Sequence, residues 1–225
     1  QRAEREYGVP AEISVSIIGV ETRYGRNKGS YRVIDALSTL AFDYPARSSF
    51  FSKELKHFLI LSREQSLPTT ELLGSYAGAM GYGQFMPSSY RSYAVDFDGD
   101  GVVDIWNNPV DAIGSVANYF SRHGWRTGEA VVSRATVDDD YEQGMANTGL
   151  KPTKTVADLA LGGIFPQQEV PADMLVTLMQ FEGKAGMEHW IGMKNFYVIT
   201  RYNHSAMYAM SVYQLSKDID AQLHK

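Results

Sequence analysis

Apolar residues recur every three or four positions over several long segments of the chain, which is the spacing of helices with one buried face. In the first half and at the C-terminal end this pattern predicts helices at residues 9–24, 32–40, 48–66, 109–123 and 206–222. Pro10 suits the first turn of the first helix and Gly25 its end, while Asn108 and Pro109 suit the start of the fourth. Residues expected to form the buried face of the third helix are Phe51, Leu55, Phe58, Leu59 and Ser62.

The helical spacing of apolar residues gives way to strand-like segments after Gly128. Strands are expected within residues 129–137 and 174–181, and a strand–turn–strand within 183–203. The sequence therefore predicts a mainly α member of the α+β class. Its helical core would comprise residues 1–127 together with 196–225, and residues 128–195 would form a small β-containing insertion.

The composition is that of a globular protein with 44% hydrophobic residues among 225. A net charge of −5 without a run of lysine or arginine argues against a nucleic-acid partner. The absence of cysteine excludes disulfides, thiolate metal sites and a cysteine nucleophile. The apolar run at 13–20 is too short to span a bilayer. A chain that begins at Gln1 is compatible with earlier removal of a leader or a tether.

Glu21 is the first candidate for chemistry. On a helix it shares a face with Ile17 and Ile18, close to the negative end of the helix dipole. Partial desolvation and the dipole would both raise the pKa of its carboxyl group, which would suit a general acid. The alternative is a surface glutamate that pairs with Arg23 or Arg26, because ion-pair networks also perturb pKa values.

Residues 96–111, "DFDGDGVVDIWNNPVD", begin as an EF-hand loop does. The predicted ligands are the side chains of Asp96, Asp98, Asp100, Asp104 and Asp111 and the backbone carbonyl of Val102. Asn107 stands where an EF-hand has its bidentate glutamate, so Asp111 would close the shell. Oxygen ligands without histidine or cysteine favour Ca²⁺, in a structural role. The alternative is a solvated turn of Asp and Gly without an ion.

Residues 74–90, "GSYAGAMGYGQFMPSSY", are rich in glycine but lack the Lys-Ser/Thr of a phosphate loop. Glycines permit close approach of a ligand to the backbone, and Gln84 offers both a donor and an acceptor. Alone, this stretch indicates no particular chemistry.

Three blocks in order, "GVETRYG", "AGAMGYGQFMPSSY" and "RYNHS", closely resemble the B-type lytic murein transglycosylases of Gram-negative bacteria, which have a lysozyme-like core. The resemblance extends from Val9 to Leu215, includes an EF-hand-like loop, and is weakest within 128–195. The large N-terminal helical region of that family is largely absent, so we expect a fragment or a short member. The resemblance implies a periplasmic monomer that acts on peptidoglycan strands, with a lipid tether to the outer membrane as an option in the parent protein.

The resemblance also implies roles for individual residues. Glu21 would be the sole catalytic acid and base, and Ser75 and Gln84 would line the scissile site. Residues that would shape the glycan groove are Tyr119, Tyr202, Asn203 and Tyr208. Phe50 stands at a groove position that can be tyrosine in the family, and Trp106 is expected in the core.

The implied reaction cleaves the bond between N-acetylmuramic acid and N-acetylglucosamine and leaves a 1,6-anhydromuramic acid end. Two alternatives stay open. A hydrolytic muramidase would need a second carboxylate, for which Asp35, Asp43 and Glu71 are candidates by residue type only. A wall-binding module stabilised by calcium would bind glycan without turnover.

Overall fold

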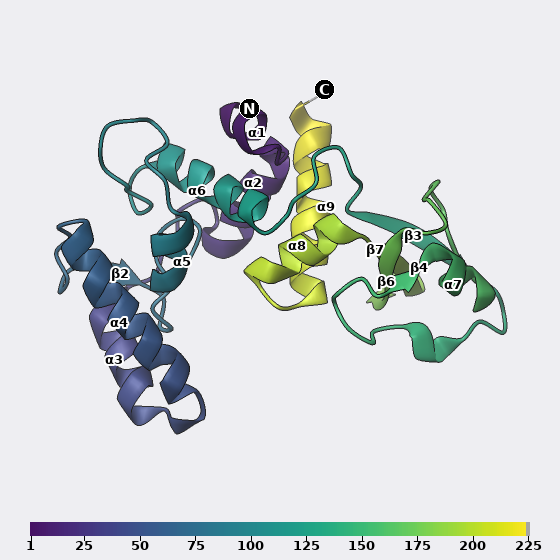
Figure 1. Ribbon diagram of the computed structural model, residues 1–225, viewed down its shortest axis with the longest axis horizontal. Helices are drawn as coiled ribbons and strands as arrows, with labels where there is room; N and C mark the ends of the chain where they lie inside the picture. The colour runs from purple at the N-terminus through teal and green to yellow at the C-terminus, as the bar shows by residue number, and fades with distance from the viewer. Residues whose placement is uncertain (224–225) are drawn as a thin grey trace. The chain divides into compact units, whose positions relative to one another are not determined.

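The computed structural model describes residues 1–223 and is mainly helical (Figure 1). Its helices are α1 Arg2–Tyr7, α2 Ala11–Thr22, α3 Val33–Asp43, α4 Ser48–Glu64, α5 Pro87–Tyr93, α6 Pro109–Arg122, α7 Val156–Leu161, α8 Lys194–Tyr202 and α9 Ala206–Leu223, with 3₁₀ turns at Pro45–Arg47 and Gln143–Met145. Its strands are β1 Tyr31–Arg32, β2 Leu73–Gly74, β3 Val132–Val137, β4 Lys154–Thr155, β5 Ile164–Pro166, β6 Leu175–Gly183 and β7 Gly186–Gly192.

The chain forms two compact units. The first comprises residues 1–122 with the C-terminal residues from Ile219 on, and the second comprises His123–Asp218. These units place α8 and most of α9 with the sheet. The division expected from the sequence, 1–127 with 196–225 and 128–195, stays a prediction.

In the first unit, α3 and α4 lie side by side as a helical hairpin (Figure 1). Phe51, Phe58 and Leu61 are buried on α4, whereas Leu59 is 49% exposed, so its predicted burial is wrong. The buried positions of α4 follow a narrower stripe than the sequence suggested, because one face of this helix packs on α3 and on α5.

In the second unit, an antiparallel sheet has the strand order β4-β6-β7-β3-β5. Its core is formed by Val156, Leu159, Ile164, Val176, Leu178, Ile191 and Met193. The strands predicted within 129–137 and 174–181 are confirmed as β3 and β6. The α+β class with mostly helical structure is confirmed as well.

The second strand expected within 183–203 is wrong, because residues 194–202 form α8. Phe196, Val198 and Ile199 are residue types enriched in strands, and this favoured the wrong element. In the structure Asn195, Phe196 and Ile199 are buried at helical spacing. Tertiary packing therefore outweighs the local propensity.

The five predicted helices are confirmed as α2, α3, α4, α6 and α9, with ends shifted by up to three residues. The short helices α1, α5 and α7 were not predicted, because six or seven residues carry little periodicity. Among the described residues, no helix is both long and apolar enough to cross a bilayer.

Candidate active site

Glu21 is the second-last residue of α2 and is half-buried. Ile17 and Ile18, on the same helix face, are 0% and 6% exposed. The sequence-based placement of this carboxyl group on an apolar face at the C-terminal end of a helix is therefore confirmed.

The turn after Glu21 ends the helix earlier than predicted. Arg23, not Gly25, is the C-cap, with φ of 50°, and its N–H donates to the carbonyl of Gly19 over 2.9 Å. Tyr24 follows with φ of 58°. Two consecutive non-glycine residues in the left-handed region cost about 1–2 kcal/mol each. Such strain persists only where surrounding contacts fix it, and it clusters at functional sites.

Thr22 supplies those contacts. Its buried hydroxyl oxygen accepts a hydrogen bond from the N–H of Gly25 over 3.0 Å. The same oxygen lies 3.0 Å from the carbonyl oxygens of both Ile18 and Tyr82, which share its single hydrogen. The helix end that carries Glu21 is thus bonded directly to the glycine-rich stretch.

Further contacts hold residues 25–32 against the same stretch. Tyr31 and Arg32 pair with Gly74 and Leu73 as β1 and β2. A methyl group on Gly29, which has φ of 94°, would lie 2.0 Å from the carbonyl carbon of Gly74, so only glycine fits at this crossing. The structure therefore brings the segment after Glu21 and the glycine-rich stretch together in one unit.

Lys28 connects the segment after Glu21 to Trp106 and to Tyr82. Its ammonium donates to the carbonyl of Trp106 and lies 4.6 Å from the centre of the Tyr82 ring. Trp106 is 8% exposed, so its predicted place in the core is confirmed.

Ser75 and Gln84 both lie in the glycine-rich stretch and have defined partners. The hydroxyl oxygen of Ser75 accepts from the N–H groups of Ala77 and Ala79, over 3.3 and 3.1 Å. The side-chain NH₂ of Gln84 donates to the carbonyls of Lys28 and Gly81, over 3.2 and 2.9 Å. These four bonds do not use the hydroxyl hydrogen of Ser75 or the side-chain carbonyl oxygen of Gln84.

The predicted groove residues are distributed over both units. Tyr119 lies on α6 in the first unit, where its ring is 7% exposed and packs 4.9 Å from the ring of Tyr93. Tyr202, Asn203 and Tyr208 lie in the second unit, at the end of α8 and the start of α9.

Phe50 lies near the start of α4 and is 38% exposed. The guanidinium of Arg47 lies over its ring at 4.6 Å, and the ring of Phe51 is 5.0 Å away. The exposed ring thus has an apolar and a cationic neighbour at the hairpin.

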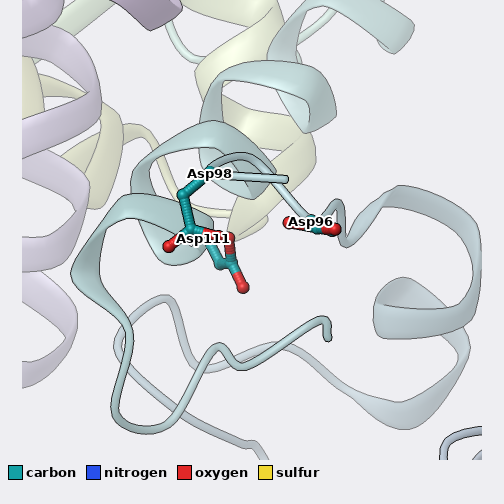
Figure 2. Close-up of side chains that lie close together, drawn as sticks. All are labelled: Asp96, Asp98 and Asp111. Atoms are coloured by element: carbon teal, nitrogen blue, oxygen red, sulfur yellow. The ribbon is translucent and has the colours of Figure 1, made fainter. Parts of the chain in front are cut away.

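The acidic loop is a second cluster, and three of its predicted ligands converge. The carboxylates of Asp96, Asp98 and Asp111 each offer an oxygen atom within 4.8 Å of the other two (Figure 2). The backbone N–H groups of Gly101, Gly99 and Asp100 donate to Asp96 and lower the pKa of its carboxyl group.

Asp111 connects both ends of this loop from the first turn of α6. It is fully buried, and its two oxygens accept from the N–H groups of Phe97 and Asp104 over 2.7 and 2.8 Å. Asn108 contributes as predicted to the start of α6, since its side-chain oxygen accepts from the N–H of Val110.

The remaining predicted ligands are Asp100, Asp104 and the backbone carbonyl of Val102. One carboxylate oxygen of Asp104 accepts from Trp106 and Asn107, and one of Asp100 accepts from Val102, within local turns. The carboxylates of Asp100 and Asp104 are not part of the converging cluster, and the role of both, like that of the Val102 carbonyl, stays a prediction.

A buried carboxylate that the sequence did not single out is Glu54 on α4, which is 5% exposed. It accepts from the N–H and the hydroxyl of Ser88, over 2.9 and 2.7 Å, at the start of α5. It thereby fixes the helix that follows Gln84. The three carboxylates considered for a hydrolytic mechanism, Asp35, Asp43 and Glu71, are exposed, and Asp35 pairs with Arg32.

Comparison with known proteins extends these observations to a family. The family model described as "Transglycosylase SLT domain" matches residues 1–217. Membrane-bound lytic murein transglycosylase B of Escherichia coli (strain K12) is 50% identical over 97% of this chain, and the chain spans 59% of that relative's length.

Solved structures agree over the whole fold. Soluble lytic transglycosylase SltB1 from Pseudomonas aeruginosa is 59% identical, with a TM-score of 0.95 over 100% of this chain and 74% of that one. The Escherichia coli lytic transglycosylase Slt35 in complex with calcium is 48% identical, with a TM-score of 0.92 over 100% of this chain and 70% of that one. These similarities confirm the expected lysozyme-like fold. The chain belongs to the transglycosylase SLT domain family.

Proposed function

We propose that this protein is a lytic transglycosylase that cleaves peptidoglycan between N-acetylmuramic acid and N-acetylglucosamine without consuming water. The observation that carries the proposal is the position of Glu21. It is half-buried at the end of α2, beside a strained turn that Thr22 bonds to the glycine-rich stretch with Ser75 and Gln84. Membership of the family supports the choice of substrate.

The proposed reaction needs one carboxyl group in two steps. Glu21, as the acid, gives its proton to the glycosidic oxygen, and the bond from that oxygen to the muramoyl C1 breaks. The muramoyl N-acetyl oxygen stabilises the positive charge that develops at C1, which is a known exception to the two-carboxylate rule. Glu21, now a carboxylate, takes the proton of the muramoyl 6-hydroxyl. The oxygen of that hydroxyl bonds to C1 and closes the 1,6-anhydro ring, so the acid form of Glu21 is restored.

The bonds of Ser75 and Gln84 suit a role beside this carboxyl group. Since Ser75 accepts from two N–H groups, its own hydrogen is its one donor function, and we assign it to a substrate oxygen. Since Gln84 donates both amide hydrogens to the backbone, we assign its oxygen to a sugar hydroxyl or N–H.

The groove proposal concerns four further residues. We assign substrate contacts to Tyr119, Tyr202, Asn203 and Tyr208. For Tyr119 the contact would be made by the hydroxyl group, because its ring packs against Tyr93 and Phe85 in the core.

One Ca²⁺ ion in the acidic loop completes the proposal. The converging groups are all carboxylates, which suit a hard cation. Asp111 accepts one N–H at each oxygen, and each oxygen keeps a second lone pair for an ion. Asp96, Asp98 and Asp111 would hold the ion, which would supply charge neutralisation and stability to the loop.

The setting follows from the substrate. Because peptidoglycan lies outside the cytoplasmic membrane and the relative of 50% identity is a membrane-bound enzyme of Escherichia coli, we place the activity in the periplasm of a Gram-negative cell, as a monomer on glycan strands. A lipid tether in the parent protein stays an option.

A matched pair of variants tests whether Glu21 catalyses cleavage of peptidoglycan. Glu21→Gln keeps the shape of the side chain but cannot transfer a proton, so release of soluble fragments from purified peptidoglycan should fall by a factor of about 10² to 10⁴. Glu12→Gln makes the same change in the first turn of the same helix and should keep full activity. Equal activity of the two variants would contradict the proposal, and binding without release by the wild type would favour a wall-binding module.

A further inference from the structure

A pocket within the second unit shares no residue with the proposed catalytic site. Its volume is about 460 Å³, in the range that holds a small ligand or a short peptide segment. Charged residues around it are Arg126, Glu129, Lys151, Asp173 and Lys194. Its apolar lining includes Pro152, Pro171, Met174, Leu175 and Tyr197.

The walls of this pocket are fixed by hydrogen bonds. The side chain of Asn195, fully buried, accepts from the N–H of Arg126 over 2.8 Å and donates to the carbonyls of Arg126 and Glu129 over 2.8 and 2.9 Å. The loop at 126–129 is thereby held against α8, which carries Lys194 and Tyr197. A pocket with walls in place before a ligand arrives loses less entropy on binding.

Backbone hydrogen bonds hold two further segments that line the pocket. The N–H of Thr153 donates to the carbonyl of Val176 over 3.1 Å, and the N–H of Met174 donates to that of Pro171 over 3.0 Å. These bonds fix the segments that carry Lys151, Asp173 and Leu175.

The charges of the pocket favour an anionic ligand. Arg126 and Glu129 form an exposed ion pair of 3.3 Å with each other. Of the other charged residues, two are lysines, Lys151 and Lys194, and one is an acid, Asp173. Three positive and two negative side chains give the lining a net charge of +1, in a chain of net charge −5. Leu175 is 54% exposed and adds apolar surface to the lining.

We infer that this pocket binds the short acidic peptide that peptidoglycan glycans carry, an inference that rests on the proposed function. Such a stem peptide combines carboxylates, small alkyl side chains and an amine. Lys151 and Lys194 meet its carboxylates, Asp173 meets its amine, and the surface of Leu175 and Met174 meets its alkyl groups. A bare neutral glycan would leave both lysines without an anionic partner.

Calorimetric titration of the full chain with a synthetic stem pentapeptide, free of sugar, tests this. The wild type should bind saturably, more weakly as the salt concentration rises. The double variant Lys151→Glu with Lys194→Glu should bind more than about twofold and up to about 25-fold more weakly, since each exposed pair contributes up to about a factor of five. Lys184→Glu, an exposed lysine in the turn between β6 and β7, is the control and should change affinity less than twofold.

Absence of saturable binding in the wild type would overturn the inference, as would equal losses in the control and the double variant. Cleavage of peptide-free glycan strands separates this result from the proposed function. A wild type that cleaves such strands but binds no peptide contradicts the pocket assignment alone. A wild type that binds the peptide but cleaves no glycan contradicts the proposed function alone.

Discussion

The hydroxyl oxygen of Thr22 lies 3.0 Å from the carbonyl oxygen of Tyr82, across 60 positions of the sequence. The residue that follows Glu21 is thus bonded to the glycine-rich stretch, while the same oxygen accepts from the N–H of Gly25. One buried hydroxyl group therefore connects the end of α2, the strained turn and the neighbouring loop.

Replacement of this hydroxyl should affect both stability and turnover. In Thr22→Val the N–H of Gly25 and the carbonyl of Tyr82 lose a partner, so the free energy of unfolding should fall by about 1–3 kcal/mol. Turnover per folded molecule should fall too, because the turn beside Glu21 is released. Thr22→Ser keeps the hydroxyl and should retain most of both. Urea unfolding combined with peptidoglycan assays measures the two effects, and indistinguishable variants would contradict this role of the hydroxyl.

The crossing of Gly29 over Gly74 gives a prediction about folding. Gly29→Ala adds a methyl group 2.0 Å from backbone atoms of Gly74 and places alanine at φ of 94°. Since backbone atoms cannot move aside as a flexible side chain can, we expect a loss of more than about 3 kcal/mol. Gly144→Ala is the control, because no atom lies within 4 Å of its added methyl group. Similar thermal midpoints for the two variants would refute the close approach.

Calcium should stabilise the chain through the acidic loop. At a Ca²⁺ concentration one hundred times the dissociation constant, the free energy of unfolding should rise by about 2.7 kcal/mol, provided that the unfolded chain binds none. Asp98→Ala removes a ligand from an exposed position and should abolish most of this gain, whereas Asp139→Ala, in an exposed loop, should keep it. Thermal melts in calcium and in EDTA that superimpose for the wild type would rule out the site.

The stability that the N-terminal cap gives to α7 should decrease at acidic pH. The carboxylate of Asp158 accepts from the backbone N–H of Thr155 over 2.8 Å, while the hydroxyl of Thr155 accepts from the N–H of Asp158. The first of these bonds, from the Thr155 backbone N–H to the carboxylate, is the largest cause of the lowered pKa of the Asp158 carboxyl group. A lowered folded-state pKa adds stability above the unfolded pKa of about 3.9, and that stability is lost as pH falls through the folded value.

Hydrogen exchange of the α7 amides measures this effect. Protection in the wild type should be constant from about pH 7 to pH 5 and should decline below about pH 4. Asp158→Ala should have lower protection at neutral pH and a shallower decline, and Asp139→Ala should behave as the wild type. An equal decline with and without the Asp158 carboxyl group would show that the cap does not carry this pH dependence.

Local patterns predicted the parts of the site that depend on one element. Helical spacing placed Glu21 beside Ile17 and Ile18, and aspartate spacing brought Asp96, Asp98 and Asp111 together. Asp104 was harder to place, because a short carboxylate at the start of a turn also bonds to the N–H groups that follow it.

Contacts between distant segments could not be predicted from one sequence. Nothing in the pattern joins Thr22 to Tyr82, or the buried Glu54 to Ser88 at the start of α5. The strand expected within 194–202 failed for a related reason, since the residues that favour strands there are buried as a helix by packing that the local sequence does not reveal.

The most direct test of the central claim is the mass of the first product formed from purified peptidoglycan in ¹⁸O-labelled water. If Glu21 acts as acid and then base and the 6-hydroxyl closes the ring, the muropeptides end in 1,6-anhydromuramic acid. They should then be one water lighter than muramidase products and contain no ¹⁸O. Primary products with a reducing end that carries ¹⁸O would show that water attacks C1 and would contradict the single-carboxylate mechanism.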